Sequence, residues 1–350
     1  MNDVRWVLHV DLDEFLAAVE VLRHPDLAGK PVVVGGRGDP TERGVVSTAS
    51  YAARKFGVRS GMPLRIAARK IPDAVFLPVD ADVYNEMSQR VMDTLRGLDV
   101  TVEVLGWDEA FLGVDSDDPE TFATVVRQAV LDSTGLHCSV GIGDNRLRAK
   151  IATGFGKPQG QFTLTQDNWF AVMGDLRPIA LWGIGSKTAK KLEALEIRTV
   201  RELAASSVED MAARFGPKIG PWLVGLGMGA GSAEVSDEPW VARSHSRETT
   251  FQHNVTDWGE VAEHVRRLAE RVTEDIRAEK RPGVRVEVKL RYAPFFTRTT
   301  SRALPDPTLD PSVISTQRCR CSNASITSGR CGWWGCGWRW WKPGSYLATP

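Results

Sequence analysis

Hydrophobic and polar positions follow two periods along the chain, and together they predict both strands and helices. Short runs rich in Val, Ile, Leu and Phe predict strands; they cover residues 4–12, 30–36, 100–105, 109–114 and 137–143. A three-to-four-residue spacing of apolar side chains predicts helices; these cover residues 47–69, with a turn at 57–63, and residues 119–134. A sheet covered by helices is the expected arrangement, so we predict an α+β fold.

The predicted helix at 119–134 has clear boundary signals. Asp118 can cap its first turn, Pro119 suits the first helical position, and Gly135 suits the end. Its apolar stripe consists of Phe122, Val125, Val126, Ala129 and Val130. We expect this stripe to be part of the core.

A separate C-terminal domain is predicted after a flexible tether. Residues 225–237 are rich in Gly and Ser, which is typical of a linker. Beyond them the pattern predicts a strand from residue 244, an amphipathic helix at 258–279, and strands at 284–292 and 296–303.

Acidic residues stand at two predicted strand ends in apolar surroundings. Val-Asp-Leu-Asp at 10–13 closes the first strand, and Trp-Asp-Glu-Ala-Phe-Leu occupies 107–112. Carboxylates flanked by Val, Leu, Phe and Trp are poorly placed for water and need a compensating charge. Oxygen ligands, with no His or Cys counted among them, favour Mg²⁺ or Mn²⁺ over zinc, and two such ions suit in-line phosphoryl transfer.

Six blocks of sequence occur in a characteristic order. They are HVDLDEFLAAVE (9–20), GKPVVVGG (29–36), STASYAARKFGVRSGMPL (47–64), GWDEAFL (106–112), CSVGIGDNRLRAKIATGFGKPQG (138–160) and LWGIGSKTAKKLEALEI (181–197). In this order and at these separations, residues 6 to 314 of the chain resemble the Y-family DNA polymerases, the translesion class, in the bacterial polymerase IV branch.

The resemblance implies a right-hand polymerase core of palm, fingers and helical thumb, followed by a C-terminal α/β little finger domain. The domains are expected at 1–24 and 75–168 for the palm, 25–74 for the fingers, 169–232 for the thumb with its helix-hairpin-helix, and 233–316 for the little finger. It also implies template-directed transfer of nucleotides from nucleoside triphosphates to the 3′ end of a DNA primer, in DNA repair and damage tolerance. Primer-template DNA and nucleoside triphosphates are therefore the expected partners.

Catalytic roles follow from the same resemblance. Asp11 and Asp108 match the carboxylates that bridge two Mg²⁺ ions, with Mn²⁺ as an alternative. Glu109 matches the ligand nearer the metal that activates the primer 3′-hydroxyl. Asp13 is either a further ligand or a support for the site.

Nucleotide-binding roles are carried over in the same way. Thr48, Tyr51 and Arg54 match the fingers positions that hold the incoming triphosphate, and Lys157 matches the palm lysine that does so. Cationic side chains suit this task because they balance the charge that develops on pyrophosphate.

Leu16 departs from the family pattern. The residue after Phe15 is normally a Tyr or Phe whose ring lies under the sugar and excludes a 2′-hydroxyl. Leucine is smaller and flexible, so we predict weak sugar discrimination, with ribonucleotides inserted readily alongside deoxyribonucleotides. In the alternative interpretation, Phe15 or the local backbone still closes the sugar pocket.

DNA contacts are expected from two regions. Gly183, Gly185 and Lys187 have the form of a helix-hairpin-helix, in which free amides hold a DNA phosphate; an ordinary tight helix turn is the alternative. The chain carries no net charge, which is unexpected for a DNA-binding protein. Basic residues, Arg291 and Arg298 among them, nevertheless gather on the predicted strands of the little finger.

Composition excludes some classes of protein. No apolar run approaches the length of a membrane span, and the first residues lack the order of a signal peptide, so we expect a cytoplasmic protein. Cys138 lies in a predicted buried strand, in agreement with a reducing compartment. We expect a monomer. A sliding clamp is the protein partner that the resemblance suggests, although no clamp-binding motif is recognisable.

The composition changes abruptly near residue 317. Cysteines and tryptophans become frequent; they are Cys319, Cys321, Cys331, Cys336, Trp333, Trp334, Trp338, Trp340 and Trp341. The cysteines lack the paired two-residue spacing of common zinc sites, so we do not expect a zinc site. A choice of permitted GC-rich codons for 317–341, read one frame over, can encode an amphipathic helix followed by a strand. These are the two elements with which the little finger ends in this family.

We therefore interpret residues 317–350 as an aberrant tail that arose by a frameshift. We expect the tail to be disordered, and the little finger to be incomplete with an unpaired sheet edge.

Three other functions compete with a polymerase. They are a non-catalytic polymerase-like DNA-binding scaffold, a nuclease or other Mg²⁺ phosphotransferase, and an inactive frameshifted product. Three converging acids argue against the scaffold, and Tyr51, Arg54 and Lys157 at triphosphate-binding positions argue against the nuclease. We therefore predict a DNA-directed DNA polymerase.

Overall fold

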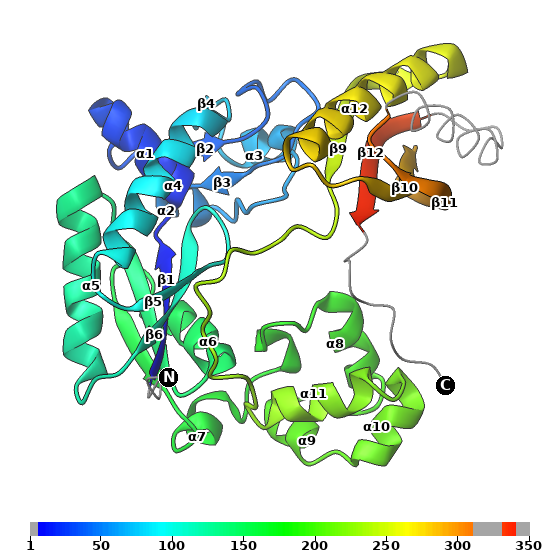
Figure 1. The fold of residues 1–350 in the computed structure, drawn as a ribbon. Coiled ribbons are helices and arrows are strands. Elements are labelled where there is room, and N and C mark those ends of the chain that lie inside the picture. The colour runs from blue at the N-terminus through cyan, green and yellow to red at the C-terminus, as the bar shows by residue number, and fades with distance from the viewer. Residues whose placement is uncertain (1–5, 311–330, 341–350) are drawn as a thin grey trace. The chain divides into compact units, whose positions relative to one another are not determined.

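The computed structural model describes residues 6–310 and 331–340 (Figure 1). The chain divides into two compact units. Over the described residues, the first consists of residues 6–39, 46–62 and 66–238, and the second of residues 40–45, 63–65, 239–310 and 331–340.

A five-stranded sheet forms the centre of the first unit. Its strands, in spatial order, are β5 (Thr101–Val104), β6 (Glu109–Val114), β1 (Trp6–Leu12), β7 (Cys138–Gly143) and β8 (Gln161–Leu164). The central strand β1 pairs antiparallel with both β6 and β7, and β8 pairs parallel with β7. The two runs predicted as strands at 100–105 and 109–114 therefore pair as a hairpin.

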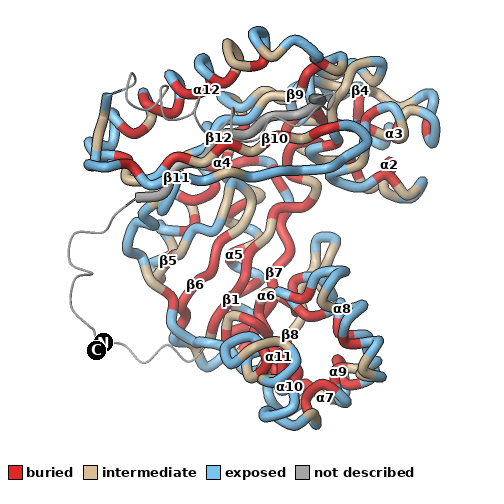
Figure 2. Tube along the Cα trace, turned by 90° about the vertical axis from the view of Figure 1, so that its right-hand side faces the viewer, coloured by how far each residue is buried: buried red, intermediate tan, exposed pale blue. Residues whose placement is uncertain are grey.

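The two faces of this sheet have different coverings, because side chains alternate along each strand. Leu8, Val10 and Leu12 point into the main core. That core also takes side chains from α1 (Phe15–Arg23), α4 (Ala81–Arg96) and α5 (Pro119–Thr134). Val7 points to the other face, where it packs with Ala149 of α6 (Arg146–Gly156). Figure 2 shows β1, β6 and β7 as largely buried strands.

Gly141 permits α6 to lie directly on β7. A Cβ atom added there would come within 2.0 Å of the Ala149 carbonyl oxygen and 2.3 Å of the Thr153 nitrogen. Any other residue would push the helix away from the sheet. The close approach brings the polar side chains of α6 to the odd-numbered positions of β1.

Helix α5 begins and ends where the sequence predicts. The Asp118 side chain accepts a hydrogen bond from the Thr121 N–H, and Gly135 adopts a left-handed conformation with φ 72°. The predicted stripe is wrong at Val125, which is 47% exposed. The buried face is rotated toward Ala123, because the helix packs on the sheet along Ala123, Val126 and Val130.

The segment between the first strand and α4 forms a small three-stranded sheet with short helices. Its strands, in spatial order, are β3 (Thr48–Ala49), β2 (Val32–Val34) and β4 (Val75–Leu77), with the helices η1 (Pro25–Leu27), α2 (Tyr51–Arg54) and α3 (Leu64–Lys70). The sequence predicted a helix from residue 47. Instead, Thr48 and Ala49 pair with β2, and the Ser50 side chain caps α2 by accepting from the Ala53 N–H.

Residues 169–227 form a cluster of short helices. These are α7 (Trp169–Met173), η2 (Pro178–Ala180), α8 (Ser186–Glu193), α9 (Val200–Ala204), α10 (Val208–Phe215) and α11 (Ile219–Gly227). The buried Trp169 ring fixes their packing, and its Nε1 donates to the Gly227 carbonyl oxygen at 2.8 Å.

The second unit contains one long helix and a four-stranded sheet. In spatial order the strands are β11 (Phe296–Thr308), β10 (Gly283–Tyr292), β12 (Cys331–Trp340) and β9 (Ser246–Val255); the helix is α12 (Trp258–Ala278). Val261, Val265 and Leu268 of α12 pack on Val288 and Leu290 of β10. Among the described residues, no helix is both long and apolar enough to span a membrane.

The structure differs from the sequence-based expectation in the tail. We expected residues 317–350 to be disordered and to leave a sheet edge unpaired, but residues 331–340 form β12, which pairs with β10 on one side and β9 on the other. The expectation rested on composition, whereas the Trp-rich segment has the length and β-propensity to fill the gap between β10 and β9. The rest of the predicted tail lies outside the described residues.

Candidate active site

Carboxylates from two neighbouring strands meet at one end of the central sheet. Asp11 of β1 lies opposite Glu109 of β6 in the antiparallel register, so both side chains stand on the face that α6 covers. Asp108 immediately precedes β6, and its carbonyl oxygen accepts a hydrogen bond from the Leu12 N–H at 2.8 Å. The three acids that the sequence singled out are therefore neighbours in the structure.

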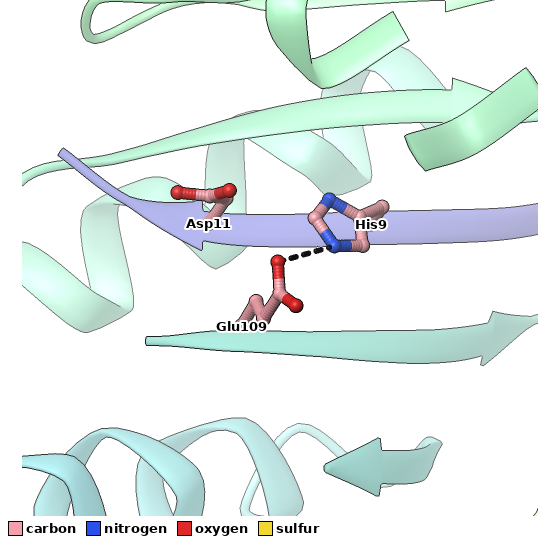
Figure 3. Close-up of side chains that lie close together, drawn as sticks. All are labelled: His9, Asp11 and Glu109. Carbon is pink, nitrogen blue, oxygen red and sulfur yellow. Dashed lines mark ion pairs between the residues drawn. The ribbon is translucent and has the colours of Figure 1, made fainter. Parts of the chain in front are cut away.

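His9 is a member of this cluster that the sequence analysis missed. It is fully buried two residues before Asp11, and its Nε2 lies 3.5 Å from Glu109 Oε2 (Figure 3). Its Nδ1 lies 2.8 Å from Thr153 Oγ1 of α6. Strand alternation offered the signal, because residues 9 and 11 of one strand share a face.

Two lysines supply positive charge to the acids. Lys150 of α6 forms an ion pair with Glu109 and places its Nζ 3.9 Å from Asp11 Oδ2. Lys157, which follows α6, forms an ion pair with Asp11. The sequence singled out Lys157 as a triphosphate ligand, and in the structure its ammonium group lies at Asp11. Lys150 was not predicted, since only the packing of α6 on the sheet brings it here.

The pKa values of the acids reflect this environment. The hydrogen bond to His9 is the largest influence on Glu109 and, together with Lys150, lowers the pKa of its carboxyl to about 2 against the opposing effect of burial. Asp108 behaves oppositely, because burial and then the charges of Asp11 and Glu109 raise the pKa of its carboxyl. Crowded carboxylates of this kind favour a bound cation.

The cluster can be tested as a metal site. Within the described part of the chain, His9, Asp11 and Glu109 form a group whose candidate ligand atoms lie within 4.8 Å of one another, and Asp108 is not in that group. Both His9 nitrogens already lie near other polar groups, with Lys150 Nζ 3.2 Å from Nε2. The carboxylate oxygens are the donors that suit a hard divalent cation, so the residues fit such an ion.

The predicted triphosphate ligands of the fingers are anchored to the end of β1. The Tyr51 hydroxyl donates to Asp13 Oδ1 at 2.6 Å, and its backbone N–H donates to the Glu14 carboxylate. Burial and then the bond to Asp13 raise the pKa of the Tyr51 phenol well above its usual range. The Arg54 guanidinium carbon lies 4.9 Å from the centre of the Tyr51 ring. Thr48 lies on β3, three residues before the start of α2.

Phe15 and Leu16 begin α1, directly after the acidic turn. Phe15 is 2% exposed, and its ring packs edge-on against Tyr84 with 6.4 Å between ring centres. Leu16 is also buried, at 6% exposure. Both side chains therefore belong to the main core.

The predicted DNA-binding residues fall in different units. Gly183 has φ 102°, and a Cβ atom there would lie 3.0 Å from the Trp222 ring, so the turn before α8 requires glycine. Gly185 adopts an extended conformation as the residue before α8, and Lys187 is exposed on its first turn. Arg291 of β10 donates to Thr297 Oγ1 at 2.9 Å.

On β11, Arg298 lies opposite Leu290 of β10. Arg291 and Arg298 thus belong to one hairpin of the second unit, whereas the glycine turn belongs to the first.

Comparisons with known families cover most of the chain. The model of the impB/mucB/samB family matches residues 10–154, and that of the family's C-terminal domain matches residues 242–330. The model of the thumb domain of DNA polymerase-iota matches residues 179–225.

Individual proteins agree with these families. DNA polymerase IV 2 of Mycobacterium tuberculosis (strain H37Rv) is 51% identical over 315 residues, covering 89% of this chain and 91% of that protein. DNA polymerase IV of Methanoculleus marisnigri is 40% identical over 319 residues, covering 89% and 87%. A solved Y-family DNA polymerase chimera of Dbh and Dpo4 has the same fold, with a TM-score of 0.85 and 24% identity, covering 95% of this chain and 98% of the chimera.

Proposed function

Because the chain belongs to the Y family of DNA polymerases, in the polymerase IV branch, we propose that Asp11, Asp108 and Glu109 form its catalytic centre. The protein is a DNA-directed DNA polymerase of the translesion class, with DNA and nucleotides as its substrates. The observation that carries the proposal is the meeting of these acids at the ends of β1 and β6. An isolated binding scaffold has no use for so much negative charge in one place.

The three carboxylates would hold two divalent ions, Mg²⁺ or Mn²⁺, which supply Lewis acidity toward the primer 3′-hydroxyl and the phosphates. The protein itself holds the carboxylates in place. His9 and Lys150 lower the pKa of Glu109 and so keep it ionised, and Lys157 forms an ion pair with Asp11.

The triphosphate would lie between the fingers and the palm. Tyr51 and Arg54 stack on one another in α2, and Lys157 lies beside Asp11, so cations can approach the phosphates from two elements. Thr48 is added to this set by its family position. Arg54 and Lys157 would offset the charge that develops on pyrophosphate as it leaves.

Sugar discrimination is proposed to be weak. Leu16 offers a branched aliphatic side chain at the family position of the aromatic ring that forms the wall under the ribose. The packing of Phe15 on Tyr84 supports the proposal, because it occupies the Phe15 ring elsewhere. Single-turnover insertion of dGTP and GTP opposite dC tests this, with Leu16→Tyr as the variant. A strong preference of the wild-type protein for dGTP over GTP that Leu16→Tyr does not increase would contradict the proposal.

DNA is proposed to contact two surfaces. The amides that follow Gly183 and Gly185, together with Lys187, would hold the DNA backbone, and Arg291 and Arg298 would add contacts from the little finger. Neutralising either arginine should weaken DNA binding at all sequences and flatten its salt dependence by about one counterion. We also infer that the protein acts as a cytoplasmic monomer, from the sequence features given above.

The metal role is tested by conservative substitution of the acids. Asp11→Asn and Glu109→Gln each keep the side-chain shape but remove charge, and each should slow primer extension by roughly a thousandfold, as loss of a group that acts on the transition state does. Glu86→Gln, at an exposed position of α4, is the matched control. Equal rates in all three variants would remove the acids from catalysis.

A further inference from the structure

Asp13 is a buried carboxylate whose oxygens are all engaged by donors. It is 3% exposed. Tyr51 Oη donates to Oδ1 at 2.6 Å, Ser139 Oγ lies 3.1 Å from Oδ1 and 3.0 Å from Oδ2, and the Gln159 N–H donates to Oδ2 at 2.7 Å. Lys157 Nζ lies 3.8 Å from Oδ1. Three hydrogen-bond donors and the Lys157 ammonium group therefore surround the two oxygens of Asp13.

The donors come from separate parts of the first unit. Tyr51 begins α2, Ser139 lies on β7, and Gln159 lies in the turn that carries Lys157. The contacts from Tyr51 and Gln159 each connect Asp13 to a predicted triphosphate ligand. The phenol fixes the ring on which Arg54 stacks, and the Gln159 amide fixes the turn two residues after Lys157.

We propose that Asp13 is a positioning residue that sets the spacing between the fingers cation Arg54 and the palm cation Lys157, and that it is not a metal ligand. This inference rests on the proposed function. A metal bound to Asp13 would have to displace three hydrogen bonds in a site closed to water, which is costly. Among the described residues, the neighbouring Asp11 instead contacts the two lysines, forming an ion pair with Lys157 and lying 3.9 Å from Lys150.

Asp13→Asn is the informative change, because it keeps the shape and alters the donors and acceptors. An asparagine has one acceptor oxygen, and its amide nitrogen can only donate. The Gln159 N–H cannot accept a hydrogen bond, so the oxygen must face it. The Tyr51 hydroxyl would then face the asparagine amide nitrogen and would have to accept a hydrogen bond from it. The charge-assisted hydrogen bond that the hydroxyl donates to the carboxylate would be lost.

The test is single-turnover primer extension across a range of nucleotide concentrations, which separates the apparent Kd of the nucleotide from the maximal rate. Inhibition by tripolyphosphate is measured in parallel, because this probe has no base or sugar. Asp13→Asn should raise the nucleotide Kd and the tripolyphosphate inhibition constant by about 10-fold, the size typical of a hydrogen bond to a charged group, with a smaller change in maximal rate. Asp118→Asn, the same change at the exposed cap of α5, is the matched control.

A double-mutant cycle shows whether Asp13 acts through Tyr51. In a Tyr51→Phe background the phenol is already gone, so Asp13→Asn should add about threefold or less to the nucleotide Kd. Additive effects would overturn the coupling. A loss of maximal rate of about a thousandfold that Mn²⁺ or excess Mg²⁺ restores would overturn the proposal as a whole and make Asp13 a metal ligand.

A second variant covers the case in which Asp13→Asn does not fold. Ser139→Ala removes one donor to Asp13 without touching Tyr51, Arg54 or Lys157, and it should raise the nucleotide Kd by about two- to fourfold, only when Tyr51 is present. An unchanged Kd in Ser139→Ala overturns the proposal. If the wild-type protein extends no primer, the proposed function itself has failed; if it extends primers and Asp13→Asn matches it, only this inference has failed.

Discussion

Lys150 and a divalent cation should compete for the same carboxylates, and this competition can be measured. Lys150 pairs with Glu109 and lies 3.9 Å from Asp11 Oδ2. At that separation two unit charges attract by about 4 kcal/mol with an effective dielectric constant near 20. Lys150 and Asp11 are about one-fifth exposed, with side-chain values of 19% and 20%. Solvent screening and desolvation therefore reduce the net contribution to about 1–2 kcal/mol.

Lys150→Met should therefore destabilise the metal-free protein by about 1–2 kcal/mol. A bound cation replaces the missing charge, so the metal-bound variant should lose little. By linkage, the apparent affinity for Mn²⁺ or Mg²⁺ should rise by about 5- to 30-fold.

The assay is thermal unfolding with increasing Mn²⁺ or Mg²⁺, for the wild type and for Lys150→Met. The variant should melt at a lower temperature without metal and show the larger increase when metal is added. Lys191→Met, at an exposed position of α8, is the control for loss of one positive charge. Equal metal-induced shifts in the wild type and Lys150→Met would refute the reasoning, because they would mean that the ion binds elsewhere.

Two further predictions concern the same sheet. Gly141→Ala should lower the free energy of unfolding in urea by about 3 kcal/mol, because the added Cβ atom would lie 2.0 Å from a carbonyl oxygen. Gly154→Ala on α6 is the control, since a Cβ atom there meets no atom within 4 Å, and it should be neutral or stabilising. Equal effects of the two changes would contradict the close packing of α6 on β7. Since the pKa of Glu109 is lowered to about 2, its contribution to stability is complete above about pH 4.5 and is lost as the pH falls toward 2. Glu109→Gln removes the titrating carboxyl, so the free energy of unfolding should fall less steeply between about pH 4.5 and pH 2 than in the wild type, and an unchanged pH dependence would argue against the lowered pKa of Glu109.

Local patterns in the sequence predicted much of the fold. The strand runs and the caps of α5 were identifiable because they depend on neighbours along the chain. The position of Val125 was not, since the rotation of a helix on a sheet depends on the partner surface. Thr48 was predicted as helical for a related reason: its pairing with Val34 is a contact between distant segments.

The site followed the same division. Asp11, Asp108 and Glu109 were identifiable from carboxylates at apolar strand ends, and the structure brings them together. Lys150 was missed because its contact to Glu109 depends on the packing of α6 against β7 at Gly141. His9 was missed although strand alternation places it on the same face of β1 as Asp11. In the tail, composition predicted disorder for a segment whose backbone pairs on both sides as β12.

The most direct test of the account is extension of a labelled primer on a DNA template by the purified protein with Mg²⁺. Deoxyribonucleotides and ribonucleotides are offered separately, with Asp108→Ala as the control. The account predicts template-directed extension with both kinds of nucleotide, abolished in Asp108→Ala. A folded, DNA-binding protein that extends no primer, or that extends primers equally well without the Asp108 carboxylate, would contradict it.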